Sequence, residues 1–190
     1  VEQARSIQLV DEAALGTRII GLAALLNDKS DTDEISGDDL HDVGSAALIH
    51  RLLKAPDGSV RLIIQGLERI RIKQYSQRDP YLKAKVEVAP DVVEKTVEVE
   101  ALMRNTLDLF RRLVGLVPNM PDELMMAAMN VEDPRQLVYL IATSIRMNVA
   151  DGQAILSLDQ VKDKLAKLNE ILGREVEVLE LGRKIATDAQ

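Results

Sequence analysis

The sequence predicts an α+β protein with a small, mostly antiparallel β-rich lobe over residues 1–89 and a helical lobe over residues 90–190. Three observations support this fold class. Before Pro90 the apolar residues form short runs with the period of two that strands have. Beyond it they recur every three or four residues over long stretches, as on one face of a helix. The change from one period to the other places the boundary between the two lobes.

The β-rich lobe opens with a helix, a strand and an acidic loop. Residues 4–15 predict one helix, which Gly16 ends. Residues 18–26 are mostly apolar and predict a buried strand. Residues 27–42 are rich in aspartate and contain Gly37, which indicates a solvated loop.

A strong hairpin signal follows at residues 56–59, where Pro-Asp-Gly-Ser separates two apolar runs. Glycine supplies the positive φ that such a turn requires, so the pattern predicts two antiparallel strands. In the second strand, alternate residues point to opposite faces until Gly66, which predicts a bend or bulge. Residues 81–89 alternate in the same way and predict a further strand.

The helical lobe begins with a long amphipathic helix over residues 92–117. Its apolar side chains form one stripe, and Pro118 ends it. Proline in a first turn, or a pair of capping residues, marks the starts of later helices. These starts are predicted at Pro121, at Asp133 with Pro134, and at Ser157 with Gln160.

The last helix carries apolar residues three and four positions apart from Leu158 to Leu172. Glu175 and Gly182 then interrupt this spacing. We expect the helix to pack first as a member of the bundle and to continue as a stalk, ending the lobe in a long helix.

The order of motifs in both lobes resembles the amino-terminal domain of the ATP-dependent Lon proteases. In the β-rich lobe the resemblance rests on three motifs: the hairpin at residues 56–59, the sequence QGLER at residues 65–69 and the sequence PYLKA at residues 80–84. Each motif is weak alone, but their shared order is fairly specific. Further similarity occurs at residues 5–7, 19–23, 133–137 and 150–158, so the resemblance runs from about Ala4 to the carboxyl end.

The resemblance implies a PUA-like β-lobe, a helical bundle and a role without catalysis. The chain would be the substrate-recognition and assembly domain of an ATP-dependent serine protease that degrades misfolded or damaged proteins and short-lived regulatory proteins. Family members usually open with a strand that here would precede Val1, and Glu2 stands where glycine is usual. Without that strand, its partner would be an exposed edge. A stand-alone protein- or peptide-binding adaptor is the main alternative, and a nuclease or hydrolase is a third.

The same resemblance implies the partners and cofactors. The partners would be unfolded or damaged protein substrates and the protein's own AAA+ and protease modules. The parent would be a hexamer, whereas this chain alone is expected to be a monomer or a weak dimer through its last helix. ATP and magnesium would bind in the parent's ATPase module, so no cofactor is expected in this chain.

Composition limits the alternatives. There is no cysteine, which excludes disulfides and thiolate metal sites and favours the cytoplasm. No apolar run reaches the roughly 18 residues of a membrane span. The formal net charge of −7 would repel a phosphate backbone, so nucleic acid is an unlikely partner.

Catalytic and metal-binding residues are not predicted. A phosphate-binding loop of the Walker type needs glycine followed by lysine, and the chain has no such pair. The two histidines, His41 and His50, lack the spacing of a zinc motif and are expected to be ordinary loop and strand residues.

A cluster of methionines is the candidate for binding substrate. Methionine is unbranched and polarisable, so a cluster can adapt to varied apolar surfaces. The alternative is that these side chains fill the core of the bundle. The four residues, out of six methionines in the chain, are Met120, Met125, Met126 and Met129.

A basic stripe on the sheet is the weaker candidate, for nucleic acid. The alternative is a solvated face whose charges discourage pairing at the sheet edge. Its five residues are Arg69, Arg71, Lys73, Lys83 and Lys85.

Overall fold

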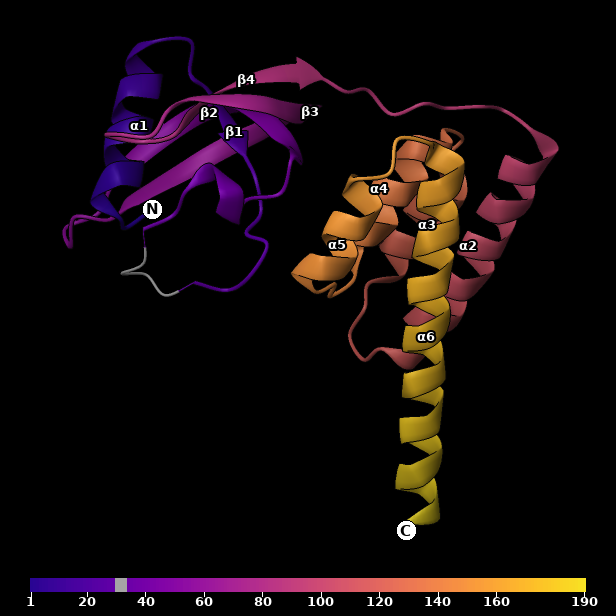
Figure 1. The fold of residues 1–190 in the computed structure, drawn as a ribbon. Helices are drawn as coiled ribbons and strands as arrows, with labels where there is room; N and C mark the ends of the chain where they lie inside the picture. Colours follow the sequence, from indigo (N-terminus) through magenta and orange to yellow (C-terminus); the bar gives the residue numbers. More distant parts are fainter. Residues whose placement is uncertain (30–33) are drawn as a thin grey trace. The chain divides into compact units, whose positions relative to one another are not determined.

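The computed structural model describes residues 1–29 and 34–190 and divides the chain into two compact units, Val1–Pro90 and Asp91–Gln190 (Figure 1). This division lies one residue from the predicted lobe boundary. Part of the predicted acidic loop, residues 30–33, lies outside the described residues.

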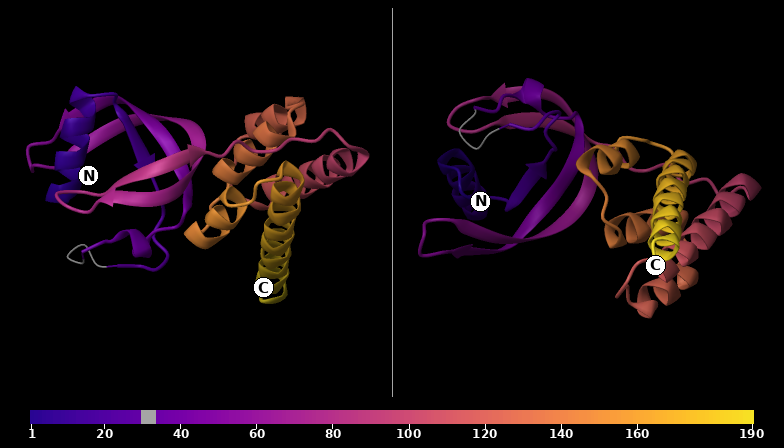
Figure 2. Two further views of the ribbon diagram at one scale, coloured as in Figure 1. Left: turned by 45° about the horizontal axis from the view of Figure 1, so that its top comes forward. Right: turned by 90° about the horizontal axis from the view of Figure 1, so that it is seen from below.

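The first unit is a curved antiparallel sheet with one helix, as the sequence predicts. The sheet has the strand order β1-β2-β3-β4, so each strand pairs with its neighbour along the chain. In Figure 2 the long strands β2 and β3 curve round the side on which α1 lies. The elements are α1 (Ala4–Leu15), β1 (Ile19–Leu22), the short 3-10 helix η1 (Gly37–Asp39), β2 (Val43–Lys54), β3 (Val60–Gln77) and β4 (Lys83–Val88).

The core of this unit lies between α1 and the sheet. The predicted bounds of α1 and its end at Gly16 are confirmed. Its apolar face contributes Val10, which packs with side chains from the first three strands. The buried residues of this core are Val10, Ile20, Ala47, Ile49 and Val60.

The predicted buried strand over residues 18–26 is wrong in length and in burial. Strand β1 covers only Ile19–Leu22, and of its residues only Ile20 is buried. The reason is its position, because β1 is an edge strand that pairs with β2 alone. Ile19 and Leu22 are therefore almost half exposed.

The predicted hairpin and bulge are both confirmed. Gly58 adopts a φ of 87°, and its N–H donates to the Ala55 carbonyl oxygen at 3.0 Å. Further along β3, Ala47 faces Gly66 while Ala46 faces Glu68. One residue of β3, Leu67, is therefore unmatched, which is the geometry of a β-bulge.

The second unit, which is described throughout, is a helical bundle. Its five helices are α2 (Val97–Leu116), α3 (Asp122–Asn130), α4 (Pro134–Ser144), α5 (Val149–Leu156) and α6 (Val161–Asp188). The predicted stripe on α2 forms part of the core, where Phe110 packs among fully buried leucine and isoleucine side chains of α4 and α6. The predicted helix starts at Pro121 and Asp133 are confirmed.

Two predicted helix starts are wrong. Helix α2 begins at Val97 rather than residue 92, because Thr96 caps it and accepts a hydrogen bond from the Val99 N–H. Val92 instead forms a short parallel bridge with Gln160. The capping box of Ser157 with Gln160 does not form. Ser157 ends α5, a helix that the sequence did not predict, and its hydroxyl accepts from the Gln153 amide at 2.9 Å.

Helix α6 packs in the bundle first and then continues as an exposed stalk, as predicted (Figure 1). Its buried positions end at Val176. Beyond that point Val178, Leu181 and Ile185 are each more than half exposed and follow one another at spacings of three and four. They therefore lie along one side of the stalk.

Candidate functional site

The predicted methionine cluster is divided between core and surface. Met120 and Met125, the packed methionine pair, lie against the core of the second unit. Met126 and Met129, the exposed methionine pair, are 63% and 56% exposed. Because they lie three positions apart on α3, the exposed pair shares one face of the helix. A binding role for either pair stays a prediction.

The basic stripe is not a continuous exposed surface. Arg69 was predicted to be solvated, but it is buried and its Nε donates to the Ala89 carbonyl oxygen at 2.7 Å. Arg71 is half-buried, and Glu87 lies directly opposite it on β4. Lys73 also pairs with Glu87, at 3.3 Å. Binding of nucleic acid by this face stays a prediction.

The two remaining lysines of the stripe, Lys83 and Lys85, are exposed on β4. The Lys83 Nζ lies 5.6 Å from the centre of the Tyr81 ring, within the range of a cation–π contact. The structure therefore leaves these two lysines exposed, whereas Arg69 is buried.

An aliphatic surface that the sequence did not single out lies on the outer face of the sheet. Residues directly opposite each other on paired strands share a face, and successive residues alternate. Ile19 alternates with the core residue Ile20, and Ile63 alternates with Ile64, which lies opposite the core residue Ile49. Leu53 lies opposite Arg61, which alternates with the core residue Val60, because a bulge between Ile49 and Arg51 shifts the alternation of β2. The aliphatic face consists of three outward side chains, Ile19, Leu53 and Ile63, which are 49%, 56% and 52% exposed.

Polar groups surround this aliphatic face. Arg51 lies opposite Ile63, and Arg61 lies opposite Leu53. The His50 ring and the Gln65 side chain form a hydrogen bond of 2.7 Å. Isolated exposed aliphatic residues are ordinary on protein surfaces, whereas a contiguous apolar patch with a polar rim marks an interaction surface. Leu53 and Ile63 are diagonal neighbours on paired strands, and Ile19 lies on the edge strand β1.

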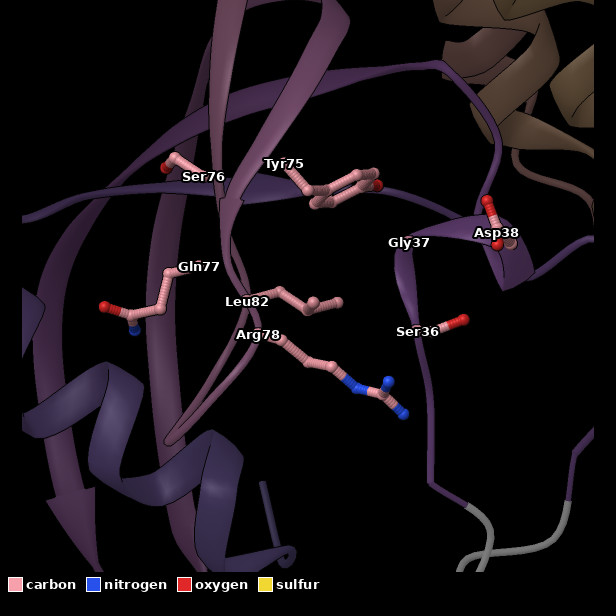
Figure 3. Close-up of a pocket in the computed structure, with 8 residues that line it drawn as sticks. All are labelled: Ser36, Gly37, Asp38, Tyr75, Ser76, Gln77, Arg78 and Leu82. Carbon is pink, nitrogen blue, oxygen red and sulfur yellow. The ribbon is translucent and has the colours of Figure 1, made fainter.

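A surface hollow lies beside the segment that carries η1 (Figure 3). Tyr75, Arg78 and Leu82 point toward that segment, and Gly37 sits so close to the Tyr75 ring that a Cβ atom on it would overlap the ring. Burial, together with the charges of nearby Asp42 and Asp38, raises the pKa of Tyr75. The hollow is lined by Ser36, Gly37, Asp38, Tyr75, Ser76, Gln77, Arg78 and Leu82.

The hollow does not have the arrangement of a catalytic centre. The Ser36 hydroxyl donates to the Asp39 carboxylate at 3.2 Å, within a capping box of η1, and no histidine lines the hollow. A serine nucleophile needs an adjacent base and a place for the substrate carbonyl, which this lining does not provide. Among residues 1–29 and 34–190, no three His, Asp or Glu side chains are placed to hold a metal ion.

A buried ion network lies at the start of the second unit. The Asp91 side chain is 1% exposed and accepts from the Arg135 Nε at 2.9 Å and the Tyr139 hydroxyl at 2.8 Å. The Nζ of the fully buried Lys164 lies 3.2 Å from the other Asp91 carboxylate oxygen. It also donates to the Ile155 carbonyl oxygen at 2.8 Å.

These contacts set the charge state of Asp91. Burial alone would raise its pKa, but the hydrogen bond from Tyr139, the charge of Lys164 and the bond from Arg135 together lower the pKa below its ordinary value. The network therefore holds an ionised carboxylate inside the bundle. It joins the first residue of the unit to α4 and α6, and through Lys164 to α5.

Comparisons with known proteins identify the family. The family model described as the ATP-dependent protease La (LON) substrate-binding domain matches residues 1–174. "Lon protease 1" of Herpetosiphon aurantiacus is 42% identical over 192 residues, and the "Lon protease" of Dictyoglomus thermophilum is 40% identical over 190 residues. Each alignment covers 100% of this chain and 24% of the relative, so the chain spans about a quarter of the relatives' length.

Solved structures share the fold. The N-terminal domain of the Mycobacterium avium complex Lon protease aligns with a TM-score of 0.70 at 18% identity, covering 90% of this chain and 86% of that one. A Lon N-terminal domain protein from Xanthomonas campestris aligns with a TM-score of 0.57 at 17% identity, covering 88% and 84%. The α+β fold class is confirmed by this likeness. On the family match, the chain belongs to the substrate-binding domains of the ATP-dependent Lon proteases.

Proposed function

We propose that this chain binds unfolded or damaged segments of other proteins through the aliphatic face and delivers them to an ATP-dependent serine protease. The observation that carries the proposal is the aliphatic face itself. Its three side chains are about half exposed and lie on three adjacent strands. Unfolded proteins expose apolar side chains that folded ones bury, so such a surface distinguishes the two.

Binding to this face would be weak for each side chain and additive over several. Covering the exposed half of an isoleucine removes roughly 50 Å² of apolar surface from water, worth about 1 kcal/mol. Three such residues therefore contribute about 3 kcal/mol, or roughly a hundredfold in affinity. This magnitude suits a domain that must hold many different segments and release them.

The test is a binding titration with a fluorescently labelled, permanently unfolded protein, such as a reduced and alkylated casein-like chain. Replacing Ile63 by threonine, which keeps the β-branched shape, should weaken binding about fivefold. The triple replacement Ile19→Thr, Leu53→Thr and Ile63→Thr should weaken it by roughly a hundredfold.

The matched control replaces the exposed methionine pair by serine, since these residues are equally exposed on the second unit. We expect little change from this control. If the methionine variant loses binding while the triple variant keeps it, the binding surface is the methionine pair. If the unaltered chain shows no affinity for any unfolded protein, the proposed function is refuted.

Assembly into a larger protease is the second part of the proposal. The exposed stripe of Val178, Leu181 and Ile185 on the stalk has the spacing of a short coiled-coil contact. We propose that the stalk connects the domain to AAA+ and protease modules in a cytoplasmic hexamer. The chain alone would be a monomer or a weak dimer. Sedimentation measurements on the unaltered chain and on the Leu181→Lys variant would distinguish these two states.

Neither a membrane nor a nucleic acid is part of this proposal. No helix among the described residues is long and apolar enough to cross a membrane. Most of the predicted basic stripe is buried, half-buried or paired with Glu87, and the chain is acidic as a whole. Binding that is unchanged between low and high salt would agree with an apolar rather than a phosphate contact.

A further inference from the structure

Two arginines share the outward face of the sheet with two members of the aliphatic face. Arg51 lies directly opposite Ile63, and Leu53 lies directly opposite Arg61. Opposite residues of paired strands share a face, and so do alternate residues of one strand, so these four side chains all point away from the core. We call the four residues the arginine–aliphatic patch. They project from the face of two paired strands rather than from an edge of the sheet.

All four side chains of the arginine–aliphatic patch reach solvent. Leu53 and Ile63 are more than half exposed, and both arginines are exposed as well. The Cβ atoms of directly opposite residues are about 5 Å apart, and those of diagonal neighbours are about 7 Å apart. Each guanidinium therefore lies beside one aliphatic side chain and close to the other. A single short segment of another protein can contact both kinds of side chain at once.

The two arginines have no counter-charge in the described part of the chain. Within residues 1–29 and 34–190, no ion pair and no side-chain hydrogen bond involves Arg51 or Arg61. By contrast, Lys54 of the same hairpin lies on the opposite face of β2 and pairs with Asp11 at 3.6 Å. Two like charges about 7 Å apart repel each other, so a carboxylate placed between them is attracted by both. The patch is thus a local positive surface on a chain whose net charge is −7.

The arrangement of the patch is approximately two-fold symmetric. Arg51 precedes Leu53 in β2, and Arg61 precedes Ile63 in β3, each by two residues. Because the two strands run antiparallel, half a turn about the normal to the sheet exchanges the two arginines and also exchanges the two aliphatic residues. A segment that crosses the patch therefore meets the same chemistry in either chain direction.

The spacing along each strand matches that of an extended polypeptide. In an extended chain, residues two positions apart point to the same side and lie about 7 Å apart. A segment with an aliphatic residue and a carboxylate at this spacing can place the first on Leu53 or Ile63 and the second on an arginine. The planar guanidinium of arginine can then bind the carboxylate through two parallel hydrogen bonds.

We infer that the arginine–aliphatic patch selects extended segments of unfolded proteins in which an aspartate or glutamate lies two positions from an aliphatic residue, in either chain direction. This inference rests on the proposed function and deepens it, because it names the class of segment that the aliphatic face prefers. The aliphatic contacts supply most of the affinity, and the arginines supply the preference among segments.

The test is an NMR titration of the whole chain with three short peptides, acetylated and amidated so that only side chains carry charge. The peptides place Leu-Ser-Glu, Glu-Ser-Leu or Leu-Ser-Gln in the middle of the same glycine-serine sequence. Shifts of the backbone amides of the patch locate the contact and give the dissociation constants. Both glutamate peptides should bind at least threefold more tightly than the glutamine peptide. Their own dissociation constants should agree within threefold, since the patch is two-fold symmetric.

Substitutions assign the preference to the two arginines. In the double variant Arg51→Gln with Arg61→Gln, the preference for glutamate over glutamine should fall below twofold. The matched control is Lys54→Gln, which removes a basic residue of the same hairpin from the opposite face and should leave the preference unchanged. All three positions are exposed, so the variants are expected to fold, and their amide spectra check this directly.

Failure of this inference is distinguishable from failure of the proposed function. A preference below threefold in the unaltered chain, or one that survives the double variant, overturns the inference and leaves the proposed function intact. A difference above threefold between the two glutamate peptides overturns recognition in either direction. If the glutamine peptide binds as tightly as the glutamate peptides once its amidated end is replaced by a free carboxylate, the patch recognises chain ends, and the inference is wrong. Only the absence of binding to the labelled unfolded protein as well as to every peptide refutes both.

Discussion

Removal of the Asp91 carboxylate is predicted to destabilise the second unit more than any other change to a charged residue considered above. In Asp91→Ala the ammonium of Lys164 stays fully buried but loses its counter-ion. It keeps only its hydrogen bonds to the carbonyl oxygens of Ile155 and Leu156, at 2.8 and 3.1 Å. Breaking a buried ion pair in this way costs about 3–5 kcal/mol. The Tyr139 hydroxyl also loses its acceptor, which places the expected loss in the upper half of that range.

The partner substitution has a smaller expected effect. Lys164→Met fills a similar volume and removes the buried positive charge, while Asp91 keeps its bonds from Arg135 and Tyr139. The double variant Asp91→Ala with Lys164→Met removes both charges, so it should be more stable than Asp91→Ala alone by about 1–3 kcal/mol. This recovery in the double-mutant cycle is the specific signature of the pair.

The assay is urea unfolding of the whole chain followed by circular dichroism at 222 nm, which reports mainly on the helical unit. A control on the same helix is Lys167→Met, since Lys167 pairs with Glu170 at 3.3 Å at the surface. The control should change the free energy of unfolding by less than about 0.5 kcal/mol. A loss below about 1 kcal/mol for Asp91→Ala, or additive effects in the cycle, would refute the assignment of a buried, coupled pair.

Three further predictions follow from single features. The folded pKa of Asp91 lies below its ordinary value of 3.8, so its stabilisation is present above that pH and is lost as the pH falls through the folded pKa. Acid titrations of unfolding should therefore show a shallower decline in Asp91→Asn, and an unchanged slope would contradict the network. Gly44→Ala should cost about 3 kcal/mol in thermal or urea unfolding, because its Cβ would overlap the Leu22 carbonyl, while Gly66→Ala, with open space around it, should cost under about 1 kcal/mol. Under mild peroxide, mass spectrometry should find the exposed methionine pair oxidised several-fold faster than the packed pair, and equal rates would be inconsistent with their different burial.

The elements that the sequence predicted well are those with a local physical signal. The turn at Gly58 needs a positive φ that glycine adopts readily, so Pro-Asp-Gly between apolar runs was sufficient. Helix α4 was likewise marked by Asp133, whose carboxylate accepts from the Arg135 N–H at 2.9 Å. In both cases the residues that carry the signal also make the interaction.

The errors have the opposite origin, because each depends on a contact between distant segments. Val92 carries a helical spacing, yet it pairs with the residues before α6 and delays the start of α2 until Thr96. Ser157 has the right spacing for a cap of α6, but the preceding helix α5 uses it as its own end. Arg69 alternates like a surface residue, and only the position of Ala89 shows that it is buried.

The proposed binding surface could not be predicted from residue type, since residues of the same type lie in the core and on the surface along one strand. Val60 and Ile64 are both β-branched and lie on the same face of β3. Val1 exchanges backbone hydrogen bonds with Val60, which is 1% exposed, whereas Ile64 is 39% exposed. A pattern of period two identifies the face that a strand turns toward the core, but the strands beside it decide how much of that face is covered. Composition singled out the methionines, whose binding role stays a prediction, and passed over Ile63, an ordinary residue whose exposure depends on the arrangement of the strands.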